Sequence, residues 1–351
     1  MKEFIPDYQN IVDCAYNHVP KRTPLYEHLV SPKVIEQMLN IKFAHLQNGS
    51  EEQQNKFFQE YCRFFKEYGY DTVSFECCIS DIMPGGGCLG DSRHPAPITN
   101  MKEFETYPWD EIPDIYFNTY SRQFDALRHN MPEGMKAIGG PGNGIFECVQ
   151  NVTGYENLCY IAMDEPELYA SLFKKVGETN LKIWRRFLKE YGDIYCVCRF
   201  GDDLGFKSAT LLSLEDIRIH IIPQYKKIID EVHAAGKPFL LHSCGCIFDV
   251  MDDLIEAGID AKHSNEDQIA GFPVWVEKYG ERIGNFGGID TDAVCRLTKE
   301  ELRAYIVKIL DQCTGHGGFA FGSGNSIPDY ASVENYREMI QIVRECRGDF
   351  R

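Results

Sequence analysis

The chain has 351 residues, and 44% of them are hydrophobic, which is enough for one large domain or two modest ones with a sizeable core. Its 36 basic and 53 acidic residues give a net charge of −17. This charge argues against binding nucleic acid or an anionic membrane surface through bulk electrostatics. No apolar run approaches the roughly 20 residues needed to span a bilayer.

The N-terminal sequence MKEFIP lacks the hydrophobic region of a signal peptide, so we expect a cytoplasmic protein. The 14 cysteines do not suggest a secreted disulfide framework, because such frameworks are normally found in short chains. We expect reduced thiols, most of them serving as small core residues. Cys244 is the exception, for reasons of position given below.

Short apolar segments that read as strands alternate with amphipathic segments that read as helices. The predicted strands cover residues 23–28, 71–76, 136–140, 193–200, 239–241, 260–264, 282–288 and 318–322. The predicted helices cover residues 7–16, 31–39, 51–67, 117–128, 154–163, 165–191, 214–235, 247–255, 298–313 and 333–345. Such alternation is typical of a parallel sheet covered by helices.

Eight strand–helix units predict an α/β fold, a (β/α)8 TIM barrel, formed by a single domain over residues 1–351. The helix at residues 7–16 precedes the first strand and is expected to be an N-terminal helical extension. Residues 84–113 are rich in Gly and Pro and are expected to form an irregular insertion, with a lid as one role for it. The glycine-rich residues 141–144 fit either a tight turn or a phosphate cradle.

Polar side chains follow most of the predicted strands, and parallel strands of a barrel end at one common mouth. We therefore expect these side chains to converge on a polar active site, although helix caps and solvated loop groups are the simpler interpretation for any single acid. The candidates are Glu27, His28, Glu76, Asp202, Asp203, His242, Cys244, Glu266, Asp290, Ser323 and Asn325.

His242 and Cys244 directly follow the strand at residues 239–241 and precede a helical pattern. They lie two residues apart, so in an extended segment their side chains point to the same side. An imidazole nitrogen and a thiolate sulfur form a zinc-type ligand pair. A catalytic zinc takes three protein ligands, so a third ligand must come from elsewhere in the chain.

The chain resembles the uroporphyrinogen decarboxylase superfamily over nearly its whole length. The resemblance rests on five segments, at residues 20–24, 201–205, 241–245, 287–290 and 322–329. Superfamily members are single-domain (β/α)8 barrels. One branch decarboxylates a polyanionic tetrapyrrole without a cofactor, and the other branch comprises corrinoid-dependent methyltransferases.

The decarboxylase branch carries an arginine-bearing N-terminal motif, because guanidinium groups suit a substrate with many carboxylates. The matching residues 24–28 contain no arginine. Residues 80–82 resemble the decarboxylases' aspartate segment, so that reading makes Asp81 the catalytic aspartate. The missing arginines and the net charge of −17 disfavour decarboxylation, which stays the second hypothesis.

The methyltransferase branch resembles this chain at His242 and Cys244, and in it zinc is held by these two residues and a later cysteine after the eighth strand. Here that segment contains Ser323 and Asn325 and no cysteine. Glu266 is our choice for the third ligand, with Cys246 as another candidate.

The resemblance thus implies a zinc-dependent enzyme that moves a methyl group between a small methylated substrate (a methyl ether, methylamine or thiol) and a corrinoid carried by a partner protein. Asp202 and Asp203 would orient the substrate or protonate the leaving group. Glu76, Asp290 and Asn325 are expected to contact the substrate. A third hypothesis is a non-catalytic barrel that binds a corrinoid protein or a small ligand.

Overall fold

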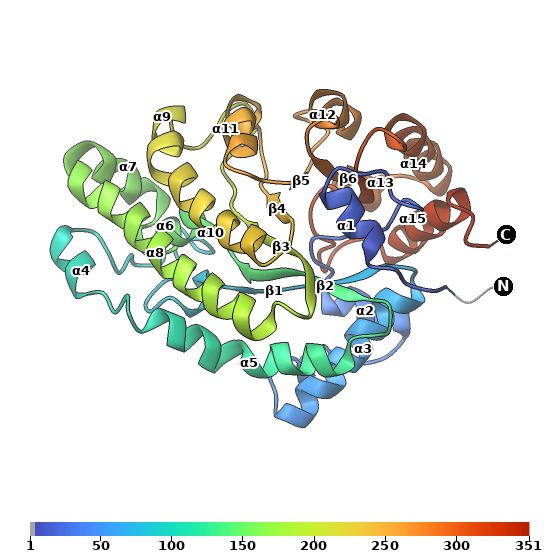
Figure 1. The fold of residues 1–351 in the computed structure, drawn as a ribbon, viewed down its shortest axis with the longest axis horizontal. Helices are drawn as coiled ribbons and strands as arrows, with labels where there is room; N and C mark the ends of the chain where they lie inside the picture. The colour runs from blue at the N-terminus through green and yellow to red at the C-terminus, as the bar shows by residue number, and fades with distance from the viewer. Residues whose placement is uncertain (1–3, 351) are drawn as a thin grey trace.

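The computed structural model describes residues 4–350, in which seven parallel strands form one curled sheet surrounded by helices (Figure 1). Neighbours in the sheet follow the chain from β1 to β7, each pair in parallel register. This confirms the α/β, TIM-barrel-like fold. The strands are β1 Thr72–Cys78, β2 Lys136–Gly142, β3 Tyr195–Gly201, β4 Phe239–His242, β5 Ala261–His263, β6 Gly284–Ile289 and β7 Phe319–Ser323.

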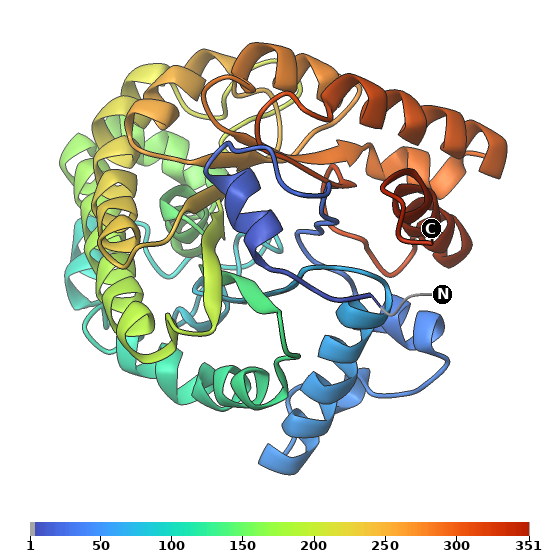
Figure 2. The ribbon, with the colours of Figure 1, turned by 45° about the vertical axis from the view of Figure 1, so that its right-hand side comes forward.

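Helices follow the strands and cover the outer face of the sheet, as the ring of helices in Figure 2 shows. Of these, α4, α6, α12 and α13 were not predicted. The helices are α1 Gln9–Ala15, α2 Pro32–Leu39, α3 Glu51–Glu67, α4 Met101–Thr106, α5 Ile112–Asn130, α6 Ile145–Thr153, α7 Tyr155–Asp164, α8 Pro166–Tyr191, α9 Leu214–Asp216, α10 Ile222–Ala234, α11 Met251–Glu256, α12 Phe272–Tyr279, α13 Thr291–Arg296, α14 Lys299–Cys313 and α15 Val333–Cys346. Short helical turns are η1 Ala44–Leu46, η2 Ser80–Ile82, η3 Ile217–Ile221 and η4 Phe248–Val250.

The strand predicted at residues 23–28 is reduced to a single bridge between Leu25 and Phe321 of β7. Two backbone hydrogen bonds make this bridge, from the Tyr26 N–H to the Phe321 carbonyl (2.8 Å) and from the Phe321 N–H to the Pro24 carbonyl (2.9 Å). On its other side the segment meets β1 through a side chain, the Ser74 hydroxyl, which donates to the Glu27 carbonyl. The segment therefore fills the place of the first strand without a continuous ladder.

The N-terminal helix α1 lies inside the ring of helices, at the end where the strands begin (dark blue in Figure 2). Its Cys14 thiol donates to the Phe319 carbonyl at the start of β7 (3.1 Å). Ile11, Cys14 and Ala15 are fully buried among inward side chains of the strands. Helix α1 thus closes the barrel end opposite the strand C-termini.

The inward positions of the strands are apolar near α1 and polar two residues later. Side chains alternate between the two faces of a strand, so residues i and i+2 share the barrel interior. The pairs are Tyr26 and His28, Val197 and Arg199, Leu240 and His242, and Ala261 and His263, all with at most 6% exposure. A polar layer therefore lies above the apolar one, toward the strand C-termini.

The Gly- and Pro-rich residues 84–113 contain helix α4 and are anchored to the end of α6. The Gly87 and Cys88 N–H groups both donate to the Asn151 carbonyl (3.2 Å), and Ile98 N–H donates to Val152 (3.1 Å). Ile98 and Trp109 are buried. No helix within the described residues 4–350 has both the length and the apolar character required to cross a membrane.

Asp202 follows β3 and caps helix α6 with its side chain. Its carboxylate accepts the backbone N–H groups of Phe146 (3.0 Å) and Glu147 (2.8 Å) and the Tyr225 hydroxyl (2.5 Å). A buried acid with three donors at a helix N-terminus stabilises that helix. The sequence suggested Asp202 as a catalytic residue, but its three hydrogen-bond partners are those of a helix cap.

Glu27 is fully buried and joins the first segment to the end of β7. Its carboxyl group accepts the Ser323 hydroxyl (2.5 Å) and backbone N–H (3.2 Å). Burial raises the pKa of Glu27 to about 8, and the hydrogen bonds from Ser323 oppose this only in part. Glu27 points away from the barrel interior because it alternates with Tyr26 and His28.

Glu27 should make stability fall with rising pH. Its pKa is about 8 in the folded chain and about 4.5 when unfolded, so the stability that the neutral group contributes is complete below pH 4.5 and is lost as pH rises through 8. The whole effect is roughly 5 kcal/mol, at ~1.4 kcal/mol per pKa unit. Urea unfolding of wild type and Glu27→Gln should show the variant gaining relative stability from pH 5 to pH 8.5. A difference that stays constant with pH would contradict the assignment.

Asp202→Ala should destabilise the protein by roughly 2–4 kcal/mol, because two helix N–H groups and a buried hydroxyl lose their acceptor. The matched control Tyr225→Phe removes one of the three donors and should cost about 1 kcal/mol. Both are measured by chemical unfolding. Wild-type stability in Asp202→Ala would show that the cap contributes nothing.

Candidate active site

His242, Cys244 and Asp203 meet where β3 and β4 end. His242 is the last residue of β4, and Cys244 lies in the turn that follows. The Cys244 backbone N–H donates to Asp203 Oδ1 (2.8 Å), which ties the two loops together. Gly245 adopts a left-handed φ of +82°, and a Cβ there would lie 2.3 Å from the Gly205 carbonyl oxygen. The close approach of these loops therefore requires glycine.

The ligand atoms of these three residues have the spacing of a metal site. His242 Nε2 lies 3.4 Å from Cys244 Sγ and 3.8 Å from Asp203 Oδ1, and all three atoms fall within 4.8 Å of one another. Tetrahedral zinc with ordinary bond lengths separates N from S by about 3.5 Å and N from O by about 3.3 Å. The N–S separation matches this geometry and the N–O separation is about 0.5 Å longer, so the three residues can serve as the three protein ligands of a zinc ion.

The Cys244 sulfur is surrounded by hydrogen-bond donors. Asn325 Nδ2 donates to it at 3.2 Å, and the Ser264 hydroxyl at 3.7 Å. The Asn325 amide is oriented by the Ser326 N–H, which donates to its Oδ1 (2.8 Å). Burial and the Asp203 carboxylate raise the pKa of the Cys244 thiol, so a cation is needed to hold the thiolate.

Two further histidines, His28 and His263, contact the His242 ring. His263 Nδ1 lies 2.7 Å from His242 Nδ1, and His263 Nε2 lies 3.0 Å from the Ser323 carbonyl oxygen. The His28 ring stacks on His242 with centroids 3.9 Å apart and 17° between planes. Burial lowers the pKa of all three histidines, that of His263 to about 3, so the rings are neutral.

The three histidines form a less suitable metal site, although their nitrogens also lie within 4.8 Å of one another. A metal ion bound to imidazole lies in the plane of the ring, and two stacked rings direct their lone pairs along nearly parallel planes. The Nδ1 atoms of His242 and His263 also form a hydrogen bond with each other, so neither is free to bind a metal ion. The set of Asp203, His242 and Cys244 is therefore the better candidate.

A buried ion pair lies next to the histidines. Arg199 donates to Glu76 through Nε (3.0 Å) and Nη2 (2.7 Å), and its Nη1 donates to the Tyr26 hydroxyl (2.9 Å). His28 Nε2 lies 3.6 Å from the other oxygen of Glu76. Glu76 thus reaches the cluster through His28, with one carboxylate oxygen already engaged by Arg199.

Besides Glu27, four of the predicted site residues lie apart from this cluster. Asp202 caps α6, as described above, and Asp290 caps α13 while accepting the Asp267 N–H (2.8 Å). Glu266 does not join the ligand atoms of His242 and Cys244; it lines a surface groove of about 720 Å³ with Asp290. The acid whose oxygen lies within 4.8 Å of the His242 and Cys244 ligand atoms is Asp203. Asp81 is exposed on η2, just after β1.

Sequence reasoning missed His263, Arg199 and Glu147. The first two occupy inward positions two residues after an apolar inward residue, so strict alternation along the strands would have found them. Glu147 lies in the first turn of α6, which was not predicted, and accepts from Asn143 Nδ2 (2.7 Å). Burial and the neighbouring Asp202 and Asp203 raise the pKa of Glu147.

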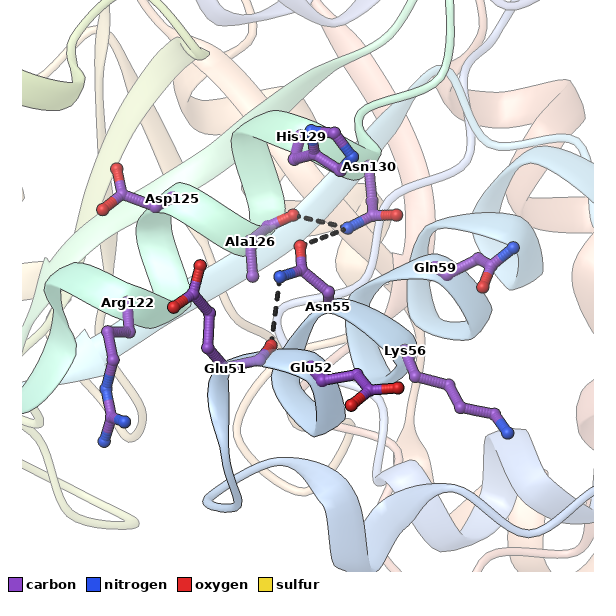
Figure 3. Close-up of a pocket in the computed structure, with 10 residues that line it drawn as sticks. All are labelled: Glu51, Glu52, Asn55, Lys56, Gln59, Arg122, Asp125, Ala126, His129 and Asn130. Carbon is purple, nitrogen blue, oxygen red and sulfur yellow. Dashed lines mark hydrogen bonds between the residues drawn. The ribbon is translucent and has the colours of Figure 1, made fainter.

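A surface groove of about 830 Å³ lies elsewhere, between α3 and α5 (Figure 3). Two of its hydrogen bonds lie within one helix, from Asn130 to the Ala126 carbonyl (2.8 Å) and from Asn55 to the Glu51 carbonyl (3.0 Å). A third joins the two helices, from Asn130 Nδ2 to Asn55 Oδ1 (3.4 Å). Both helices lie in the outer ring and contribute mixed charges there. The groove therefore offers no set of convergent groups like that at the strand ends.

The fold resembles solved structures at low sequence identity. A methyltransferase from Methanosarcina mazei matches with a TM-score of 0.71 and 13% identity, covering 96% of this chain and 98% of that one. A structure described as a putative vitamin-B12-independent methionine synthase from Listeria monocytogenes matches with a TM-score of 0.51 and 14% identity, covering 96% and 98%. No curated protein matches the sequence.

The family model for uroporphyrinogen decarboxylase (URO-D) matches residues 56–346, which include every strand of the sheet and both metal-capable loops. The polar mouth, the curled parallel sheet and this match agree with one another. The chain belongs to the uroporphyrinogen decarboxylase family.

Proposed function

We propose that the protein is a zinc-dependent methyltransferase acting on a small methylated substrate. The observation that carries the proposal is the meeting of His242 Nε2, Cys244 Sγ and Asp203 Oδ1 at the strand ends, all within 4.8 Å of one another. The fold match to the Methanosarcina mazei methyltransferase supports the same reaction class. Asp203 replaces Glu266 as the third ligand in this proposal.

In the proposed reaction, residues at the strand ends hold the metal ion, orient its sulfur ligand and supply a proton. His242, Cys244 and Asp203 would hold the zinc, which supplies a Lewis acid to the heteroatom that releases or accepts the methyl group. Asn325 and Ser264 donate to the Cys244 sulfur and keep it in place. Glu147, with its raised pKa, is the candidate to hold a proton beside Asp203 for the leaving group.

The methyl group would pass between the substrate and a corrinoid carried by a partner protein. An open mouth suits such a transfer, because the Asp203 side chain is 43% exposed. Acidic side chains follow two of the strands, Asp81 on η2 after β1 and the half-exposed Asp203 after β3. This favours a neutral or cationic substrate, such as a methyl ether or a methylamine, over an anionic thiol.

A lyase of the uroporphyrinogen decarboxylase type is the second candidate, favoured by the family match and by the exposed Asp81 after β1. Its substrate carries many carboxylates, and recognition of these requires free guanidinium groups. The arginine nearest the candidate site, Arg199, is buried and paired with Glu76. The geometry therefore supports this reading less well.

Purified wild-type protein should bind one zinc ion per chain, and the double variant His242→Ala/Cys244→Ala should bind none, as measured by elemental analysis after equilibration with zinc. Asp203→Ala should weaken binding, whereas Asp202→Ala should not, because Asp202 faces α6. Cys246→Ala is the matched cysteine control and should keep full stoichiometry. Equal zinc in wild type and the double variant would end the metal assignment.

Zinc-loaded protein should catalyse methyl exchange between methylcobalamin and a methyl acceptor. The reaction is measured from the change in the cobalamin absorption spectrum. His242→Ala should abolish the exchange, because the proposed zinc site loses one of its three protein ligands. Incubation with uroporphyrinogen provides the opposing measurement. Formation of coproporphyrinogen, lost in Asp81→Asn and kept in His242→Ala, would instead establish the lyase.

A further inference from the structure

We propose that His263 is a positioning residue that holds the His242 imidazole in the tautomer with hydrogen on Nδ1, so that the Nε2 lone pair faces Cys244 and Asp203. This inference rests on the proposed metal site at His242. It concerns a residue outside that ligand set, and it has a consequence that can be measured in the metal-free protein.

The direction of the hydrogen bonds begins at the Ser323 backbone. The Ser323 carbonyl oxygen lies 3.0 Å from His263 Nε2 and can only accept, so Nε2 carries a hydrogen. A neutral imidazole has one N–H, which leaves a lone pair on His263 Nδ1. His263 is fully buried, and both of its ring nitrogens are engaged, Nε2 by the Ser323 carbonyl and Nδ1 by His242.

The position of the hydrogen on His242 follows from that on His263. Two nitrogens 2.7 Å apart share one hydrogen, and His263 Nδ1 is the acceptor, so His242 Nδ1 is the donor. A neutral imidazole with its hydrogen on Nδ1 has its lone pair on Nε2. That atom is 3.4 Å from Cys244 Sγ and 3.8 Å from Asp203 Oδ1.

Two further contacts keep the rings in place. Ser323 is held at the end of β7 by the buried Glu27 carboxyl group, so the carbonyl at the start of the chain of hydrogen bonds is fixed. His28 covers one face of the His242 ring at a centroid distance of 3.9 Å. Rotation of His242 would lose both the stack and the hydrogen bond to His263.

Metal-binding histidines generally donate their second N–H to an acceptor, and removal of that acceptor typically lowers metal affinity by 10–100-fold. In this chain the acceptor is another imidazole, itself oriented by a main-chain carbonyl. The arrangement sets the ring before any metal arrives.

The first test is the tautomer of His242 in metal-free protein labelled with ¹⁵N-histidine, read from long-range ¹H–¹⁵N correlation spectra and assigned by loss of its signals in His242→Gln. We expect a pyrrole-type Nδ1 and a pyridine-type Nε2. In His263→Phe, which keeps an aromatic ring against Tyr26 but has no acceptor, the signals should move toward the other tautomer. A pyridine-type Nδ1 in the wild type would overturn the proposal, whether or not any variant folds.

The second test is zinc affinity, measured by competition with a chromophoric chelator. His263→Phe should bind zinc about 10–100-fold more weakly than wild type. His263→Asn, whose amide oxygen replaces the Nδ1 acceptor, should recover most of the loss, with circular dichroism confirming the fold of each variant. Equal tautomer and equal affinity in wild type and His263→Phe would refute the role of His263. A wild-type protein that binds no zinc would refute the proposed function alone, because the tautomer is measured without metal.

Discussion

The buried ion pair between Arg199 and Glu76 is the interaction on which the barrel interior depends. Both side chains are removed from water, at 0% and 5% exposure, and such a pair is tolerated only when its remaining hydrogen-bonding groups are satisfied. Tyr26 supplies one further partner on the first segment. The pair thereby links β3, β1 and the irregular segment that replaces the first strand, and it lies beside the three histidines.

The charge of Arg199 also shapes the chemistry of the site. Burial is the main cause of the lowered pKa of His28, His242 and His263, and the charge of Arg199 adds to it, so these imidazoles are neutral and can offer a lone pair. The Cys244 thiol is affected in the opposite sense, because burial and Asp203 disfavour its thiolate. A histidine prepared for a cation beside a thiol that needs one is the electrostatic condition expected of a metal site.

The replacement of the expected third thiolate alters this site in a defined way. At the end of β7 the chain has Ser323, whose hydroxyl is engaged by Glu27, and Asn325, whose amide donates to Cys244. Neither provides an anionic ligand. In the proposed site Asp203 would provide one, from the loop that follows β3. A carboxylate donates less electron density to zinc than a thiolate does, so a zinc ion held there would be a stronger Lewis acid than one with two thiolate ligands.

The sequence by itself determined the fold class, seven strands to within a few residues, and the position of His242 and Cys244 at a strand end. These features depend on local periodicity and on turn residues that follow one another in the chain. The first strand was predicted too long, because the sequence of a short extended segment does not reveal whether backbone hydrogen bonds form along both of its edges.

Only the tertiary structure decided which acid joins the histidine and cysteine. Asp202 and Asp203 are adjacent in sequence, yet one caps α6 and the other faces His242, because successive side chains point to opposite sides. Glu266 and Asp290 follow strands as predicted but turn toward the surface. His263 became significant only when its ring was seen against His242, since a hydrogen bond between residues 21 apart depends on the register of β4 and β5, which no local pattern encodes.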